Sequence, residues 1–401
     1  MAETTTPALS SNRLMSLDAY RGFVMFLMAA ELLEIPRIAA HFPGSHVWQF
    51  LKEQSSHVAW TGCSLHDLIQ PSFSFMVGVA LPFSMASRLA RGQSKLHMTL
   101  HAVWRALLLV LLGVFLRSIG KPITNWTFED TLSQIGLGYP FLFLLGFAGS
   151  KTRWASLVII LVGYWAAFAC FRLPPTDFND AAVNVPNDWS DHFDGFAAHW
   201  NINHNAAWSF DTWFMNLFPR KAPFTGNLGG YCTLSFIPTL GTMLLGLIAG
   251  TWLKQGNDDD AAEKVTTKLL ITGLVCLALG WLLHVTAICP VVKKIWTPSW
   301  TLFSGGWCFF IMAAFYHVMD VCGWKRGAFP LVVIGMNSIA MYVMVHTITG
   351  FIGDSLHTHF GRSPFLILGE TYEPMAFGGC VLLILWLILL WMHRRKIYLR
   401  I

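Results

Sequence analysis

The polar side chains best suited to chemistry lie near the start of the sequence, around its first two long apolar runs. Glu31 lies within the first run, His57 lies just before the second, and Asp67 lies at the start of the second. An imidazole has a pKa of about 6.5, so it can exchange a proton at neutral pH. These residue types therefore indicate acid–base chemistry, although a loop histidine by itself does not establish it.

The elements that must hold these side chains are membrane helices. Hydrophobic residues make up 54% of the 401 positions and charged residues only 12%, whereas soluble domains are about a quarter charged. A helix needs about 20 apolar residues to cross a bilayer, and backbone groups in lipid must be paired within their own segment. The sequence therefore predicts an all-α, polytopic bundle of about ten transmembrane helices, forming a single domain over residues 1–401. The expected spans are 22–40, 68–86, 102–116, 132–147, 154–171, 231–253, 269–288, 301–321, 331–348 and 375–392.

The orientation of the bundle follows from its basic residues. Lys and Arg of the short connections, including Arg13, Lys95 and Arg400, fall on one side if ten spans are counted. Because cytoplasmic loops are enriched in Lys and Arg, this side and both termini are expected to be cytoplasmic. Loops 41–67 and 172–230 then form an extracytoplasmic cap. The net charge of +5 reflects this bias, so no nucleic-acid partner is expected, and the short tails favour a bacterial inner (cytoplasmic) membrane.

The eight cysteines show no spacing typical of a metal or redox site, and no metal is expected. Several lie in apolar spans, where cysteine usually acts as a small buried hydrophobe. Cys63, Cys232 and Cys289 lie near the predicted outer face, and a disulfide among them is left open.

A long motif pattern connects the first two spans. It comprises Arg13-Leu14, Ser16, Asp18, Arg21-Gly22, then His57, Trp60 and Gly62, then Asp67-Leu68-Ile69, Pro71, Phe73, Phe75 and Gly78. This pattern resembles that of the transmembrane acyltransferases typified by heparan-α-glucosaminide N-acetyltransferase. Further similar segments, around Gln134, Pro238, Trp296 and Asn337, extend the resemblance over nearly the whole chain.

The resemblance implies a function. It implies that His57 is catalytic, that acetyl-CoA is the co-substrate, and that the acceptor is the amine of an amino sugar or glycan outside the cytoplasm. His57 would act as general base on that amine or would itself carry the acetyl group, and both mechanisms stay open. The resemblance also suggests a homodimer, in contact with membrane lipid.

Roles for other side chains follow from the same resemblance. Glu31, where the family often has an asparagine, is expected to hold His57 or the substrate ammonium group, or else to pair with Arg37 or another buried cation. Asp67 and Trp60 are expected to contact the substrate. Four polar residues in apolar spans are candidates to stabilise the oxyanion or bind substrate: Gln134, Asn337, Ser338 and His346. The departure at Glu31 leaves the identity of the acceptor open.

The phosphates of acetyl-CoA need cationic partners on the cytoplasmic side. Arg88, Arg105 and Lys268 are candidates, with membrane anchoring as the alternative role of each. An alternative function for the whole chain is secondary transport of a sugar or sugar-linked lipid, with a site near the bilayer midplane formed by broken helices.

Overall fold

The computed structural model describes residues 14–175, 178–256 and 259–399. Arg13 and Arg400, two of the basic residues considered above, lie outside this range. In the described ranges every regular element is a helix, and the only β contact is an isolated bridge between Thr61 and Val292. The predicted all-α fold is confirmed.

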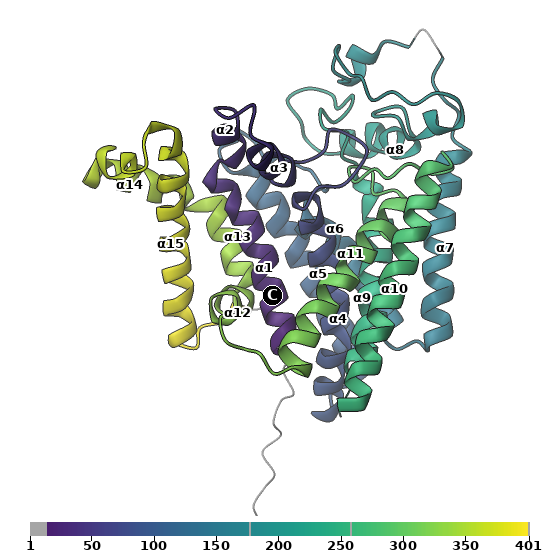
Figure 1. Cartoon of the computed structure of the whole chain (residues 1–401). Coiled ribbons are helices and arrows are strands. Elements are labelled where there is room, and N and C mark those ends of the chain that lie inside the picture. The colour runs from purple at the N-terminus through teal and green to yellow at the C-terminus, as the bar shows by residue number, and fades with distance from the viewer. Residues whose placement is uncertain (1–13, 176–177, 257–258, 400–401) are drawn as a thin grey trace, which may run out of the picture.

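The apolar helices stand side by side as a membrane bundle (Figure 1). Within the described residues, seven helices are long and apolar enough to cross a membrane, or eight if a bent pair counts as one span. The seven are α4 (Ile69–Ala90), α5 (Lys95–Ser118), α7 (Ser150–Ala169), α9 (Phe236–Leu253), α10 (Asp259–Val285), α11 (Pro298–Tyr316) and α15 (Glu373–Arg394), and the bent pair is α12 (Phe329–Met336) with α13 (Ser338–Thr347). The chain is an integral membrane protein.

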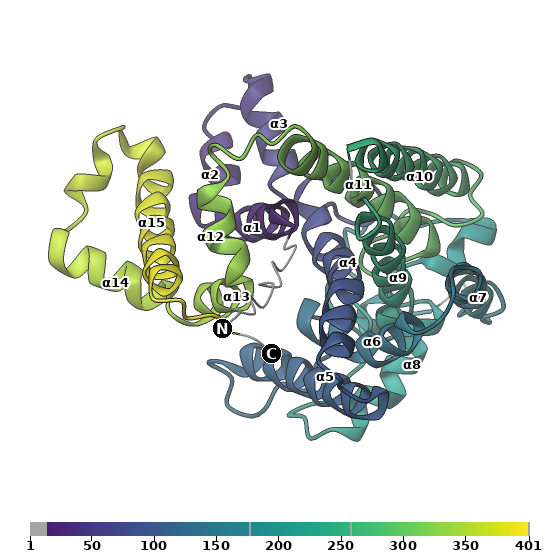
Figure 2. The ribbon, with the colours of Figure 1, turned by 90° about the horizontal axis from the view of Figure 1, so that it is seen from below.

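Two shorter apolar helices, α1 (Met15–Ala29) and α6 (Thr131–Gly146), occupy the remaining predicted spans. Each of the ten predicted spans therefore contains helix, while ten complete crossings and a cytoplasmic location of the termini stay predictions. In Figure 1, α1 begins and α15 ends at the lower end of the bundle, and Figure 2 shows the helices from this end. We call this the inner end.

Two predicted spans are broken rather than continuous. The first gives way after α1 to a short 3₁₀ turn, Ala30–Leu33, and then to Glu34 in the left-handed conformation (φ 47°), from which α2 (Ile35–Ala39) begins. The ninth bends by 79° at Asn337, between α12 and α13. The turn after α1 places Glu31 at the outer end of the bundle, beside the loop that carries His57.

Close contact between helices fixes the centre of the bundle. A Cβ atom on Gly78 of α4 would lie 1.9 Å from the carbonyl oxygen of Met243 on α9, and one on Gly246 of α9 would lie 1.9 Å from that of Phe75. Only glycine allows such an approach, as is common between membrane helices. This packing holds α4 in a fixed position, and with it the turn before α4 that contains Asp67.

The outer end carries the two loops predicted to form a cap. They contain α3 (His46–Gln54) and α8 (Ala206–Phe214), both at the top of Figure 1. The indole nitrogen of Trp60 donates a hydrogen bond to the Trp200 carbonyl at 3.2 Å, which joins the loops. A further helix, α14 (Thr349–Phe360), lies in a segment predicted to be a loop.

Candidate active site

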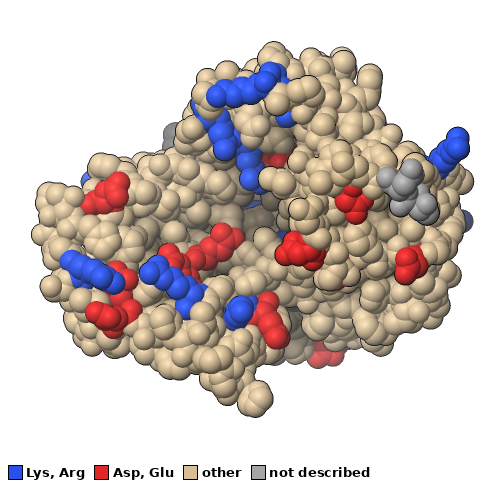
Figure 3. Space-filling view, turned by 90° about the horizontal axis from the view of Figure 1, so that it is seen from above, with Lys and Arg blue, Asp and Glu red and all other residues tan. Residues whose placement is uncertain are grey.

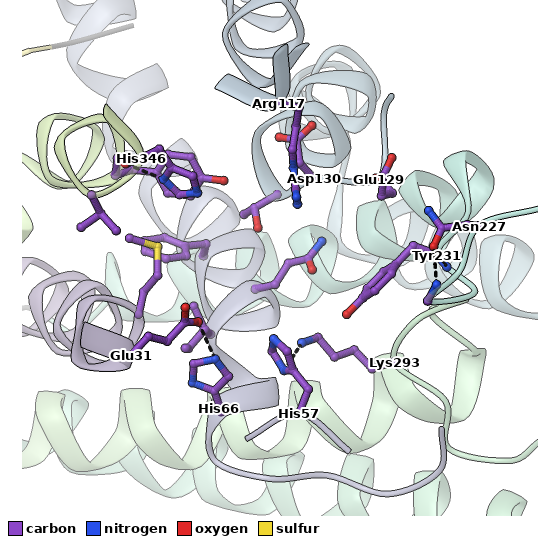
Figure 4. A pocket seen from close by; sticks show the side chains of 18 residues that line it. Glu31, His57, His66, Arg117, Glu129, Asp130, Asn227, Tyr231, Lys293 and His346 are labelled. Carbon is purple, nitrogen blue, oxygen red and sulfur yellow. Dashed lines mark hydrogen bonds and ion pairs between the residues drawn. The ribbon is translucent and has the colours of Figure 1, made fainter. Parts of the chain in front are cut away.

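A polar cavity of about 500 Å³ opens at the outer end of the bundle. Figure 3 shows this face hollowed near its centre, with charged side chains around the hollow. The walls come from the turn after α1, the loop before α4, the start of α6, the cap and α13. Elements far apart in sequence therefore contribute to one site, shown from close by in Figure 4.

His57 lies in this cavity and is held by a buried carboxylate. Its Nδ1 is 2.7 Å from Oδ1 of Asp67, which is fully buried in the turn that precedes α4. The other oxygen of Asp67 accepts hydrogen bonds from the hydroxyl and backbone N–H of Ser64 and from the backbone N–H of Val58. Asp67 therefore fixes both the imidazole and the loop that carries it.

Lys293 completes this group from the loop between α10 and α11. Its buried ammonium lies 3.0 Å from Oδ1 of Asp67 and 3.1 Å from Nδ1 of His57. Burial lowers the pKa of Lys293, and the charge of Asp67 opposes this shift. Burial also lowers the pKa of His57, with a contribution from Lys293, against the raising effect of the hydrogen bond to Asp67. The imidazole is therefore neutral at neutral pH.

A second carboxylate–histidine pair lies beside the first. His66, which is buried, places Nε2 2.7 Å from Oε1 of Glu31, and its ring centroid is 4.5 Å from that of His57. Glu31 therefore contacts His66 and not Arg37, which instead pairs with Glu34 at 2.8 Å.

The opposite wall of the cavity carries charges of both signs. Arg117, Glu129 and Asp130 line it, and in Figure 4 the Arg117 side chain extends into the cavity. Burial raises the pKa of Glu129, against the lowering effect of its backbone hydrogen bonds and of Arg117. A ligand in this cavity meets hydrogen-bonding groups on both sides.

A second cavity, of about 440 Å³, lies toward the inner end. Its lining includes four arginines, Arg21, Arg88, Arg91 and Arg105. Phe73 and Tyr342 line both cavities, so the two spaces adjoin at these side chains. A basic inner cavity thus lies next to the polar outer cavity that contains His57.

The structure brings most of the predicted site residues to these cavities. His57, Glu31 and His346 line the outer cavity, with Asp67 directly behind His57. Arg88, Arg105 and Ser338 line the inner one. Their roles stay predictions, but their positions are compatible with them.

Four other predicted residues lie elsewhere. Gln134 is fully buried and donates hydrogen bonds to the carbonyls of Phe128 and Thr233. Trp60 is buried between the cap loops.

Asn337, predicted to be catalytic, bonds instead to the C-terminal segment. Its amide donates to the Ile397 carbonyl at 3.0 Å and accepts from the backbone N–H of Leu399 at 3.1 Å. Lys268 lies on α10 in a shallow depression with Asp260, Glu263, Lys264 and Thr267, outside both cavities. A polar residue inside an apolar span indicates function at Asn337, whereas its amide connects α12 and α13 to the C-terminal segment.

Several residues of the outer cavity escaped sequence reasoning, among them His66, Lys293 and Arg117. A sequence signal could have found Lys293 and Arg117, because they are basic residues in predicted extracytoplasmic loops, where Lys and Arg are uncommon. No sequence signal pointed to His66, because its role depends on its contact with Glu31, which lies 35 residues earlier in the chain.

Comparison with known proteins bears on this site. No family model matches the chain. It is 25% identical over 368 residues to the human heparan-alpha-glucosaminide N-acetyltransferase. This match covers 82% of this chain and 52% of the human protein. It is 26% identical over 373 residues to the mouse protein of the same name, covering 83% and 53%. The chain spans about half the length of these curated relatives. The resemblance inferred from the motifs is thereby confirmed, and this chain is related over most of its length to the heparan-alpha-glucosaminide N-acetyltransferases.

Proposed function

We propose that this protein is a membrane acyltransferase that moves an acetyl group from cytosolic acetyl-CoA to the amine of an extracytoplasmic amino sugar. One observation carries the proposal: a basic inner cavity adjoins a polar outer cavity that contains a carboxylate-bound histidine. The names of the curated relatives support the same reaction class. We place the protein in a bacterial inner membrane, with the arginine-lined end facing the cytoplasm.

The acetyl donor enters from the inner end. Acetyl-CoA carries phosphates, and guanidinium groups bind phosphates with paired, charge-assisted hydrogen bonds. Arg88 and Arg105 are proposed to hold these groups in the inner cavity. The thioester then extends past Phe73 and Tyr342 toward His57.

His57 is proposed to act as general base. With its Nδ1–H donated to Asp67, the lone pair on Nε2 is available to take a proton from the sugar ammonium or amine. The neutral amine nitrogen attacks the thioester carbonyl while Nε2 of His57 takes its proton. The C–S bond then breaks, the amide forms, and the imidazolium returns the proton to the leaving CoA thiolate. Lys293 supplies positive charge near the developing oxyanion. An acetylated His57 is the alternative, and adjoining cavities favour direct transfer because both substrates can be present together.

The acceptor is proposed to occupy the outer cavity. A volume of about 500 Å³ lies within the range of small-molecule sites. Carboxylates and Arg117 on its walls suit the hydroxyl and amine groups of a sugar. Glu31 stands near His57 and is proposed to attract the ammonium form of the acceptor.

The decisive experiment is acetyl transfer by the purified protein in detergent. Labelled acetyl-CoA is incubated with a panel of amino sugars, and acetylated sugar and free CoA are measured for the wild type, His57→Ala and His357→Ala. His357 lies on α14 and stacks on Phe377, outside the outer cavity, so it serves as a matched control. Transfer by the wild type and His357→Ala but not by His57→Ala supports the proposal. Full transfer by a folded His57→Ala variant removes His57 from the mechanism.

Secondary transport is the alternative, and the 79° bend at Asn337 is the observation that favours it. Transport predicts movement of sugar across reconstituted vesicles without acetyl-CoA. Acetyl transfer predicts CoA release that depends on the acceptor. Sugar flux with no CoA release in any condition would replace the enzyme with a transporter.

A further inference from the structure

Three metal-ligand side chains converge in the outer cavity. Glu31 comes from the turn after α1, His57 from the loop before α4, and His66 from the turn at the start of α4. One donor atom from each lies within 4.8 Å of the donor atoms of the other two. In Figure 4 the three side chains face the same part of the cavity.

This donor set suits a divalent transition metal. Two imidazoles and one carboxylate are typical ligands of Zn²⁺ in sites that keep one coordination position open. Metal–ligand distances of about 2.0–2.2 Å place neighbouring donors roughly 3.3 Å apart. In the structure Oε1 of Glu31 lies 2.7 Å from Nε2 of His66, and the Glu31 side chain is 61% exposed. A small rotation of Glu31 therefore makes room for an ion, and the cavity leaves the open position accessible.

The surroundings also suit an ion at this position. A metal-binding histidine usually donates its other ring nitrogen to a carboxylate, as His57 does to Asp67. Asp67 and Glu31 carry negative charge, while Lys293 carries positive charge and pairs with Asp67 at 3.0 Å. The two carboxylates and the one ammonium together carry a net charge of about −1, which attracts an added dication.

We propose that Glu31, His57 and His66 bind a divalent transition-metal ion of the zinc class, and that bound metal excludes acetyl transfer. Metal binding and acetyl transfer exclude each other because both need Nε2 of His57, the ring nitrogen that is not bonded to Asp67. The metal site does not depend on the proposed function, whereas the inhibition of acetyl transfer by bound metal rests on that function. The sequence predicted no metal because the three ligands come from two separate turns and a loop, with no recognisable spacing.

Binding is tested first, without any activity. Metal-free protein in detergent is titrated with Zn²⁺ by calorimetry and with Co²⁺ by visible absorption, since Co²⁺ in a low-coordinate nitrogen and oxygen site absorbs in the visible range. The variants are His66→Ala and Glu31→Gln, with His346→Ala as the control. His346 lines the same cavity but is not among the three donors. Gel filtration confirms that each variant is folded.

We expect one ion per chain for the wild type and His346→Ala, and at least a tenfold weaker affinity with loss of the Co²⁺ band for the other two. Glu31→Gln keeps the test decisive if the buried His66→Ala fails to fold. Absence of binding by the wild type at 100 µM metal, or unchanged binding by Glu31→Gln, overturns the site.

The exclusion is tested by acetyl transfer with added metal. Zn²⁺ is expected to inhibit the wild type, a chelator to restore it, and Glu31→Gln to resist inhibition in whatever activity it retains. Stimulation by Zn²⁺ overturns the exclusion while leaving the site intact. If no acceptor is acetylated, the proposed function fails, yet the binding titrations still decide whether the metal site exists.

Discussion

Asp67→Asn is the substitution that most directly tests the arrangement around His57. Asp67 is fully buried and contacts two functional groups at once, the imidazole of His57 at 2.7 Å and the ammonium of Lys293 at 3.0 Å. The change keeps the size of the side chain but removes its charge. The substitution therefore tests two roles of Asp67. One is structural, as the counter-ion of Lys293, and the other is to position the imidazole of His57.

The size of each effect follows from these contacts. Loss of the counter-charge leaves Lys293 buried with an uncompensated ammonium, which costs about 3–5 kcal/mol of stability. An asparagine can also donate its amide to Nδ1 of His57 and so select the wrong tautomer. In serine-protease triads the equivalent change lowers kcat by about 10⁴-fold. We therefore expect kcat for acetyl transfer to fall by roughly 10²- to 10⁴-fold, with a smaller change in KM.

The assay combines thermal unfolding in detergent with kcat and KM for three variants. Asp67→Asn is compared with the double variant Asp67→Asn/Lys293→Met, which removes the unpaired charge. Glu34→Gln is the control, because Glu34 pairs at 2.8 Å with Arg37 and the two side chains are 48% and 63% exposed. An exposed pair of this kind contributes less than about 1 kcal/mol.

The double variant is expected to regain most of the lost stability and none of the lost kcat. Recovery of transfer along with stability would refute the positioning role, leaving Asp67 as the partner of Lys293 only. A fully stable Asp67→Asn would contradict the ionic role of Lys293.

Three other predictions follow from separate parts of the structure. Arg105→Ala is expected to raise KM for acetyl-CoA at least tenfold with little change in kcat, whereas Lys268→Ala, outside both cavities, leaves KM unchanged; steady-state kinetics distinguishes them. Gly246→Ala is expected to lower the unfolding temperature strongly because its Cβ would meet backbone 1.9 Å away, while Gly163→Ala on α7 meets nothing within 4 Å and has no such effect; equal melting curves would refute this packing. Burial raises the pKa of Asp211 to about 7. Between about pH 4 and pH 7 the unfolded chain therefore releases a proton that the folded chain keeps. Folding stability consequently falls as the pH rises through this window. Relative to wild type, Asp211→Asn should therefore gain stability across that window, by up to about 4 kcal/mol, and a constant difference in melting temperature with pH would contradict it.

The candidate site was predictable only in part. His57 and Asp67 are ten residues apart in one motif, and the resemblance alone implies the role of His57. The sequence predicts that Glu31 holds His57, another cation or the substrate, and the break after α1 places it against His66. At Asn337, a polar residue in an apolar span predicts a catalytic role, whereas its amide bonds to the backbone of the C-terminal segment.

Apolar length was enough to predict where the membrane helices lie, since lipid excludes unpaired backbone groups. The spacing of residues within two short segments was enough to show the family resemblance. Which charges meet depends on the packing of the helices. Lys293 and Asp67 are 226 residues apart, and their pairing depends on how α4 and α11 pack, which no local pattern of residues records. The two adjoining cavities arise in the same way, because each is enclosed by side chains from several helices.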